Sequence, residues 1–233
     1  DISADLNEFA GQRVAVDVSG WLHKGVYGAA EDYIDSGFYD SQLYVDYVLN
    51  RANLLKAHGL IPVMVFDGRR NCLKDGTNSK RTDTRKSYID QGKQLLENMN
   101  KVTDVECKQK LRAEAIAFFQ KGMAVTSEME NHTIAALKRM KVDVIVAPYE
   151  ADSQLAYLCK IGNCQVVMTE DSDVIVYSIV SRRPFKILFK FDKKTNKAQC
   201  LDTSKLLDLN STDDDDDDDG DLSLIHISEP TRP

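Results

Sequence analysis

The sequence predicts an α/β fold in which a mostly parallel central sheet is covered by helices on both faces. Short β-branched runs of strand length alternate along the chain with longer stretches that carry apolar residues at helical spacing. A strand–helix–strand order makes neighbouring strands parallel, because the helix must cross over the sheet. The 233-residue chain is 42% hydrophobic, so it can bury the core of one such domain.

The predicted strands are apolar runs rich in β-branched residues, and they lie at residues 13–16, 61–66, 142–147, 165–169 and 185–191. The last of them leads through the polar residues 193–197 into a hairpin partner. The predicted helices lie at residues 41–58, at two stretches within 103–140, and at 150–159. The first helix places Leu43, Tyr47, Leu54 and Leu55 on a helical period and stops at Gly59, a residue that suits a helix C-terminus.

Residues 69–100 form a different kind of segment, which is helical for most of its length, highly charged and poor in apolar anchors. We expect it to project beside the sheet as a mobile arch. Its residues 69–93 carry eight basic and three acidic side chains, a net charge of +5, and residues 182–197 carry a net charge of +6. Either segment can follow a phosphate backbone. Each, taken alone, also fits an ordinary solvated surface.

The net charge of the whole chain, −7, argues at first against a nucleic-acid partner. Much of the acid lies in residues 213–233, which carry nine acidic residues and one basic residue, so that residues 1–212 sum to +1. The charge pattern of this body is therefore compatible with DNA binding.

Several classes of protein are excluded by composition. No run approaches the 18 or so apolar residues of a membrane helix, and the N-terminus lacks the order of a signal peptide, so no membrane partner is expected. The five cysteines include no CxxC pair, which disfavours zinc and indicates a reducing compartment.

Six carboxylates follow four of the predicted strands: Asp17, Asp67, Glu150, Asp152, Asp171 and Asp173. Residues at the carboxyl ends of strands in an open α/β sheet converge on one crevice. Two carboxylates about 4 Å apart repel by roughly 4 kcal/mol at an effective dielectric of 20, so a bare cluster would protonate or open. A pair of Mg²⁺ ions would remove that conflict, because hard cations prefer oxygen ligands. A single acid at a strand end is more often a helix cap, so the prediction of a two-metal phosphodiester site depends on there being six.

The sequence blocks that carry these acids resemble those of the 5′ nuclease superfamily of flap endonucleases, in the same order along the chain. The blocks lie at residues 14–17, 21–25, 65–68, 147–158 and 169–173. Within that superfamily, residues 21–24 and 92–96 are most similar to the exonuclease 1 family of eukaryotes. The resemblance runs from about residue 5 to residue 201 and implies a PIN-like 5′ nuclease fold with a basic helical arch.

The resemblance also implies a division of the acids between two Mg²⁺ ions, which Mn²⁺ can replace. Asp17, Asp67, Glu150 and Asp152 would form the first metal set, and Asp171 and Asp173 the second. Along the chain, Glu170 lies between the ligands of the first set and those of the second, and it is expected to face away from them, or to cap the next helix.

The basic residues implied to act on DNA lie in two places. Lys74, Arg81 and Arg85 are spaced so that they can share one helical face. By the resemblance, all three bind DNA from the arch, and Lys74 and Arg81 act with the six acids in catalysis. His23 and Lys24 would contact DNA near a bend, although a lone histidine is more often structural.

The function implied is Mg²⁺-dependent 5′→3′ DNA exonuclease activity with 5′-flap endonuclease activity, in nuclear DNA repair and recombination. Its partners would be double-stranded DNA with 5′ ends, nicks or flaps, and mismatch-repair proteins for a longer parent, with the nuclease itself a monomer. The alternatives are a replication flap endonuclease, a phosphatase or PIN-like ribonuclease, and a DNA-binding fragment with impaired catalysis.

Three regions are expected along the chain: a nuclease core at 1–207, a disordered acidic segment at 208–221, and a non-native tail at 222–233. The core is expected to be incomplete at both ends. The resembling family has an N-terminal Met-Gly segment, a seventh carboxylate and a helix-two-turn-helix clamp, none of which matches a segment of this sequence.

Overall fold

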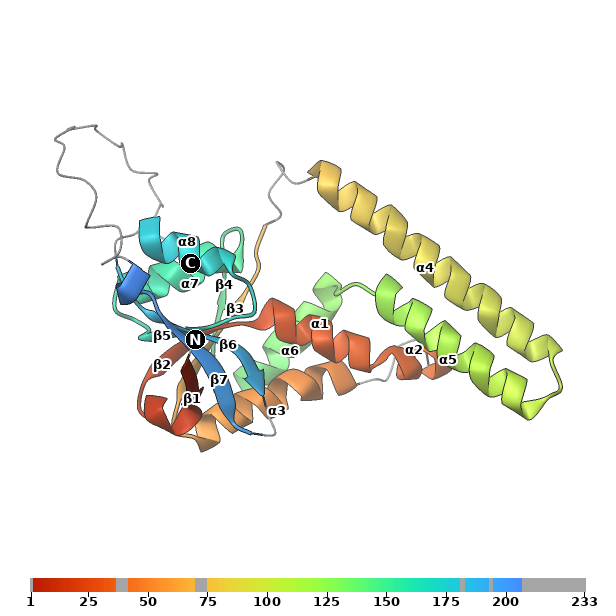
Figure 1. Ribbon diagram of the computed structural model, residues 1–233, viewed down its shortest axis with the longest axis horizontal. Helices are drawn as coiled ribbons and strands as arrows, with labels where there is room; N and C mark the ends of the chain where they lie inside the picture. The colour runs from red at the N-terminus through yellow and green to blue at the C-terminus, as the bar shows by residue number, and fades with distance from the viewer. Residues whose placement is uncertain (1, 37–41, 70–74, 181–182, 193–194, 207–233) are drawn as a thin grey trace.

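The computed structural model describes residues 2–36, 42–69, 75–180, 183–192 and 195–206 (Figure 1). Its centre is a seven-stranded sheet with the order β1-β7-β6-β5-β2-β3-β4. The strands are β1 (Ile2–Asp5), β2 (Arg13–Asp17), β3 (Ile61–Phe66), β4 (Asp143–Val146), β5 (Val166–Met168), β6 (Lys186–Asp192) and β7 (Lys197–Asp202). Strands β2 to β6 pair in parallel, and β7 and β1 add antiparallel to the β6 edge. The predicted mostly parallel sheet is confirmed.

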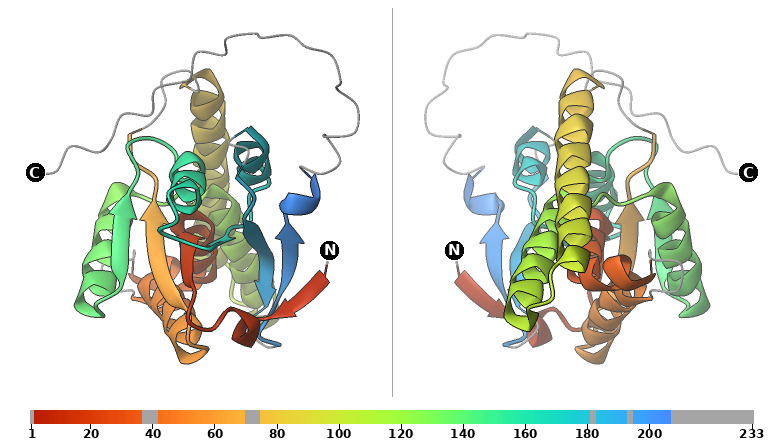
Figure 2. Two further views of the ribbon diagram at one scale, coloured as in Figure 1. Left: turned by 90° about the vertical axis from the view of Figure 1, so that its left-hand side faces the viewer. Right: turned by 90° about the vertical axis from the view of Figure 1, so that its right-hand side faces the viewer.

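Helices pack against both faces of this sheet (Figure 2). In chain order they are the 3₁₀ helix η1 (Leu6–Phe9), α1 (Val18–Gly28), α2 (Ala30–Ser36), α3 (Leu43–Ala57), α4 (Asp75–Lys101), α5 (Val105–Gly122), α6 (Ser127–Arg139), α7 (Ala151–Lys160) and α8 (Asp173–Val180). One core joins a sheet face to α1, α3 and α6, and the other joins the opposite face to α7 and α8. Among the described residues, no helix is both long and apolar enough to span a bilayer.

The two cores follow from the alternation of side chains along the strands. In β2, the side chains of Val14 and Val16 enter the core with α1 and α3, whereas Ala15 enters the core with α7. All three are fully buried. Because a parallel strand covered on both faces must be apolar at every position, continuous runs of valine are the expected signal for it.

The predicted apolar face of α3 is wrong at its first residue. Leu43 is 49% exposed, and the buried face is formed instead by Tyr44, Val45, Val48 and Leu55. The contact with α1 explains this register, because a β-carbon added to Gly25 would lie only 2.9 Å from the Tyr44 carbonyl oxygen. The close approach at Gly25 directs the Tyr44 side of α3 inward.

Helices α4 and α5 form a long hairpin that extends away from the sheet (Figure 1). Their close packing depends on Gly92, where an added β-carbon would lie 2.9 Å from the Phe119 ring. Midway along α5, the Arg112 guanidinium contacts Glu31 at 3.2 Å and Asp35 at 3.0 Å, which ties the hairpin to the α2 region. The segment expected to form a basic arch is thus mostly α4, while its residues 70–74 lie outside the described ranges.

The order of the strands places a crevice above β2. Strand β2 lies between β3 and β5. The chain leaves the carboxyl ends of these neighbouring strands toward opposite faces of the sheet. Open α/β sheets bind their ligands at the carboxyl ends of the strands at such a point. Beside it, the end of β3 is joined to the β4–α7 loop by two backbone hydrogen bonds. The Gly68 N–H donates to the Tyr149 carbonyl at 2.6 Å, and the Arg69 N–H donates to the Pro148 carbonyl at 3.1 Å.

We predict that Gly68→Ala destabilises the protein by about 2–3 kcal/mol, because overpacking against backbone cannot be relieved by a rotamer change. The new β-carbon would lie 1.7 Å from the Ala147 carbonyl oxygen. The control is Gly28→Ala, since no atom lies within 4 Å of a β-carbon added there. Urea denaturation of both variants measures the difference, and equal stabilities would contradict the proposed close contact.

Candidate metal centre and active-site cleft

A cleft of about 590 Å³ opens at the carboxyl ends of β2, β3 and β5. Five of the six predicted carboxylates line it: Asp67, Glu150, Asp152, Asp171 and Asp173. Three arginines line it as well: Arg69, Arg81 and Arg85. Acids from the sheet end and guanidinium groups from α4 therefore face the same space.

The sixth carboxylate, Asp17, is largely buried beside this cleft at the end of β2. It caps α1 by accepting a hydrogen bond from the Ser19 N–H at 2.9 Å, and it accepts a second from the Thr169 hydroxyl at 3.1 Å. The pKa of Asp17 is raised to about 6, chiefly by burial and to a smaller extent by the charges of Asp67 and Asp171. The two hydrogen bonds act in the opposite direction, because they favour the ionised form.

Asp67 is held by groups from two other segments. The Ser19 hydroxyl donates to one of its oxygens at 2.7 Å, and the N–H of Ala151, the first residue of α7, donates to the other at 2.8 Å. The second bond satisfies a backbone donor at a helix N-terminus, where negative charge is favoured. Asp67 thus joins the ends of β2 and β3 to the start of the helix that carries Asp152.

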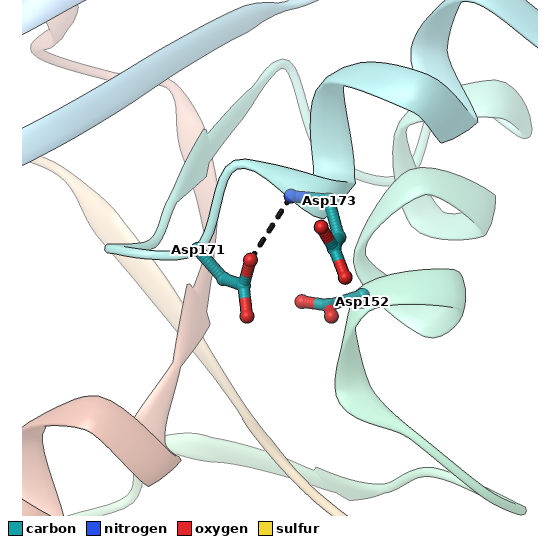
Figure 3. A group of neighbouring side chains, drawn as sticks. All are labelled: Asp152, Asp171 and Asp173. Atoms are coloured by element: carbon teal, nitrogen blue, oxygen red, sulfur yellow. Dashed lines mark hydrogen bonds between the residues drawn. The ribbon is translucent and has the colours of Figure 1, made fainter.

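Asp152, Asp171 and Asp173 form the tightest acidic group among the described residues. Each offers an oxygen within 4.8 Å of an oxygen of the other two. Figure 3 shows that the carboxylates of the three residues converge from α7 and from the β5–α8 turn. That turn is ordered by its own hydrogen bonds, because the Asp171 N–H donates to the Thr169 hydroxyl and the Asp173 N–H donates to Asp171, each at 3.0 Å.

The electrostatic cost of this convergence appears at Asp152. The pKa of Asp152 is raised to about 7, chiefly by burial and then by the charges of Asp17, Asp171, Asp67 and Asp173, in that order. A cation bound beside this carboxyl group would act in the opposite direction, because an opposite charge favours the ionised form. The oxygen-only donor set fits a hard divalent ion such as Mg²⁺.

The positions of the acids can be compared with the predicted division of the ligands between two metal ions. Asp152 belongs to the first predicted set, yet it lies against Asp171 and Asp173 of the second. Glu150 and Asp67 line the same cleft but fall outside this close group of three. Asp152 is therefore placed where the two predicted sets meet.

The predicted basic residues are only partly within the described ranges. Arg81 and Arg85, one helical turn apart on α4, both line the cleft, whereas Lys74 lies outside the described ranges. His23 on α1 lines it too. Burial lowers the pKa of His23, and the charge of Arg85 lowers it further, so the imidazole is neutral at pH 7.

Lys24 and Glu170 form an ion pair, in which the Lys24 ammonium donates to a Glu170 carboxylate oxygen. Glu170 is absent from the close acidic group and from the cleft lining among the described residues, in keeping with the expectation that it faces away from the ligands. Its partner, Lys24, is one of the two α1 residues expected to bind DNA, and the sequence contains no local signal for a pair 146 positions apart.

Reasoning from the sequence missed two residues that position the acids. Ser19 bonds both Asp17 and Asp67, and Thr169 bonds Asp17 and the backbone of Asp171. A hydroxyl two residues from an acid at a strand end is the local signal that could have indicated each of them, because such side chains form turns and caps.

Comparisons with known proteins agree with the fold. Residues 2–88 match the XPG N-terminal domain, and residues 141–219 match the XPG I-region. Exonuclease 1 of Danio rerio is 35% identical over 192 residues, which make up 82% of this chain and 22% of the relative. The chain thus spans about a fifth of the length of that curated protein.

Solved structures show the same fold at lower identity. The catalytic core of Rad2 in complex with DNA substrate matches with a TM-score of 0.58 and 22% identity, over 90% of this chain and 53% of that one. The Holliday junction-resolving enzyme GEN1, in complex with product DNA and Mg²⁺, matches with a TM-score of 0.51 and 15% identity, over 89% of this chain and 39% of that one.

The raised pKa values predict how the stability of the metal-free protein depends on pH. With folded-state values of about 6 for Asp17 and about 7 for Asp152, against 3.8 unfolded, the native state binds the extra protons between those values. The free energy of unfolding should therefore fall as pH rises from about 4 to about 8. Asp152→Asn should flatten this fall, while Asp90→Asn, on the exposed surface of α4, should leave it unchanged. Urea denaturation in EDTA measures the slope, and an equal slope for all three proteins would contradict the assignment.

Proposed function

Because the chain belongs to the XPG family of 5′ nucleases, we propose that it is the core of a divalent-metal-dependent 5′→3′ DNA exonuclease that also releases 5′ flaps. The single observation that carries this proposal is the cleft, which is lined by five of the six predicted carboxylates and by three arginines. Carboxylates can hold cations, and guanidinium groups can bind phosphate. A phosphodiester is the substrate class that needs both.

The proposed metal ligands are the six carboxylates, with Mg²⁺ as the ion and Mn²⁺ as a substitute. Two bound ions would lower the pKa of a water molecule and neutralise charge on the scissile phosphate. The protein's own contribution is to hold the ligands in place. Ser19, Thr169 and the Ala151 N–H fix the orientation of Asp17 and Asp67, so a bound cation would meet carboxylates that need little rearrangement.

The α4 helix of the α4–α5 hairpin would bind the phosphate backbone of the substrate. Arg81 and Arg85 come from α4 and line the same cleft as the acids, so a phosphate there could be bound by the two guanidinium groups and by cations held on the carboxylates. Lys74 is proposed to act with Arg81 in polarising that phosphate. The neutral His23 is suited to stacking or hydrogen bonding with a nucleotide, and Lys24 to a phosphate contact.

The substrate class we propose is double-stranded DNA with 5′ ends, nicks or flaps. Relatives named exonuclease 1 and the DNA-bound Rad2 core support this choice. Action in the nucleus during DNA repair, including mismatch repair, with mismatch-repair proteins as partners of a longer parent and a monomeric nuclease, is proposed on the same basis. The proposed boundaries are a nuclease core at 1–207, an acidic segment at 208–221 and a non-native tail at 222–233.

The metal centre is tested by the response to Mg²⁺. We expect Mg²⁺ to raise the melting temperature, because a ligand that binds only the native state stabilises it. Asp171→Ala should remove most of this response and lower nuclease activity at least about 100-fold, since even loss of an outer partner of a metal ligand costs 10–100-fold. Glu170→Ala should retain the Mg²⁺ response. Thermal melts with and without Mg²⁺ measure it, and an unchanged response in Asp171→Ala would exclude this site.

The reaction is tested on nicked duplex and 5′-flap DNA, with the products resolved by size. Stepwise shortening from a 5′ end supports the exonuclease, whereas release of the flap alone supports a replication flap endonuclease. DNA binding without cleavage by this chain, together with cleavage by a longer parent, would identify a catalytically impaired fragment.

The proposed phosphate contacts of α4 are tested by removing the charges of its arginines. Arg81→Ala and Arg85→Ala should each lower kcat/KM by roughly 10–100-fold, the loss expected for a hydrogen bond to a charged group. Lys108→Ala is the matched control, because this exposed lysine on α5 is not among the cleft residues. Equal losses in all three variants would show that the effect is general electrostatic attraction rather than contact in the cleft.

A further inference from the structure

The Lys24–Glu170 ion pair joins α1 to the turn that carries the proposed metal ligand Asp171. Glu170 precedes Asp171 directly, and Lys24 follows the cleft residue His23. Lys24 also lines a smaller hollow of about 290 Å³, which shares His23 and Arg85 with the main cleft. The pair is thus located beside the surface on which the proposed DNA backbone would lie.

The pair is accessible to solvent, with side-chain exposures of 45% for Lys24 and 33% for Glu170. Ion pairs of this kind contribute little to stability, because water and salt screen them. A phosphate oxygen offers Lys24 the same kind of acceptor as the carboxylate does. Exchange of one anion for the other would therefore cost little.

We propose that Glu170 competes with DNA phosphate for the Lys24 ammonium, and so sets how tightly the protein holds DNA beside the cleft. This inference rests on the proposed function and concerns a residue outside the catalytic group. In the free protein the carboxylate holds Lys24 in place. In the complex the ammonium passes to a phosphate, and Glu170 is left to solvent.

A purely structural pair would behave differently. If the pair only clamps the β5–α8 turn onto α1, removal of either partner loosens the turn and weakens DNA binding. If Glu170 competes with phosphate, the two removals have opposite signs. Glu170→Gln frees Lys24 and tightens binding, whereas Lys24→Ala removes a phosphate contact and weakens it.

The test is a double-mutant cycle on DNA affinity, with Ca²⁺ in place of Mg²⁺ and a fluorescent nicked duplex as the probe. The proteins are the unaltered chain, Glu170→Gln, Lys24→Ala and the double variant. Glu97→Gln is a control that removes a carboxylate from the exposed surface of α4. Thermal melts establish that each protein is folded, and Kd is measured over a range of salt concentrations.

We expect Glu170→Gln to lower Kd by about two- to fivefold, the range set by an exposed ion pair. Lys24→Ala should raise Kd and reduce the salt slope by about 0.9, the loss of one phosphate contact. Glu170→Gln should have no effect when Lys24 is absent, and Glu97→Gln should have none in either background.

Weaker or unchanged binding by Glu170→Gln would overturn the proposal in favour of a structural clamp. Tighter binding that persists without Lys24 would overturn it as well, because Glu170 would then repel DNA directly. Failure of the unaltered protein to bind DNA would contradict the proposed function itself, whereas DNA binding without coupling between the two residues would contradict only this inference.

Discussion

Repulsion among carboxylates at the carboxyl ends of β2, β3 and β5 is the constraint on which the rest of the site depends. Parallel pairing of these strands brings Asp17, Asp67 and Asp171 to one edge of the sheet. Burial and the charges of the neighbouring acids together raise the pKa of Asp152 to about 7. A divalent cation bound among these carboxylates would favour their ionised forms.

The surrounding structure holds the acids against that repulsion. The core on each face of the sheet makes the strand ends rigid, and hydrogen bonds from Ser19, Thr169 and Ala151 orient the carboxylates that follow. The α4–α5 hairpin then brings Arg81 and Arg85 over the same cleft. Negative charge is thus concentrated where metal ions are needed, and positive charge where a phosphate backbone would pass.

Much of this arrangement could be predicted from the sequence, because it follows from local patterns. The buried strands are continuous valine-rich runs, and the acids directly follow them. Helices α1 and α2 were not predicted. Two further elements were missed for physical reasons: β1 is a four-residue edge strand paired to the distant β7, and α8 is built from β-branched residues that favour strands. The Lys24–Glu170 pair and the bond from Ala151 to Asp67 join segments far apart in the chain, so local pattern could not reveal them.

A two-metal site in the acidic cleft can be tested by anomalous diffraction from crystals soaked in Mn²⁺, because this measurement locates the ions without relying on turnover. We expect two peaks in the cleft, one of them within coordination distance of Asp152, Asp171 and Asp173. Manganese bound elsewhere on the protein, with no peak among these carboxylates, would contradict the two-metal site.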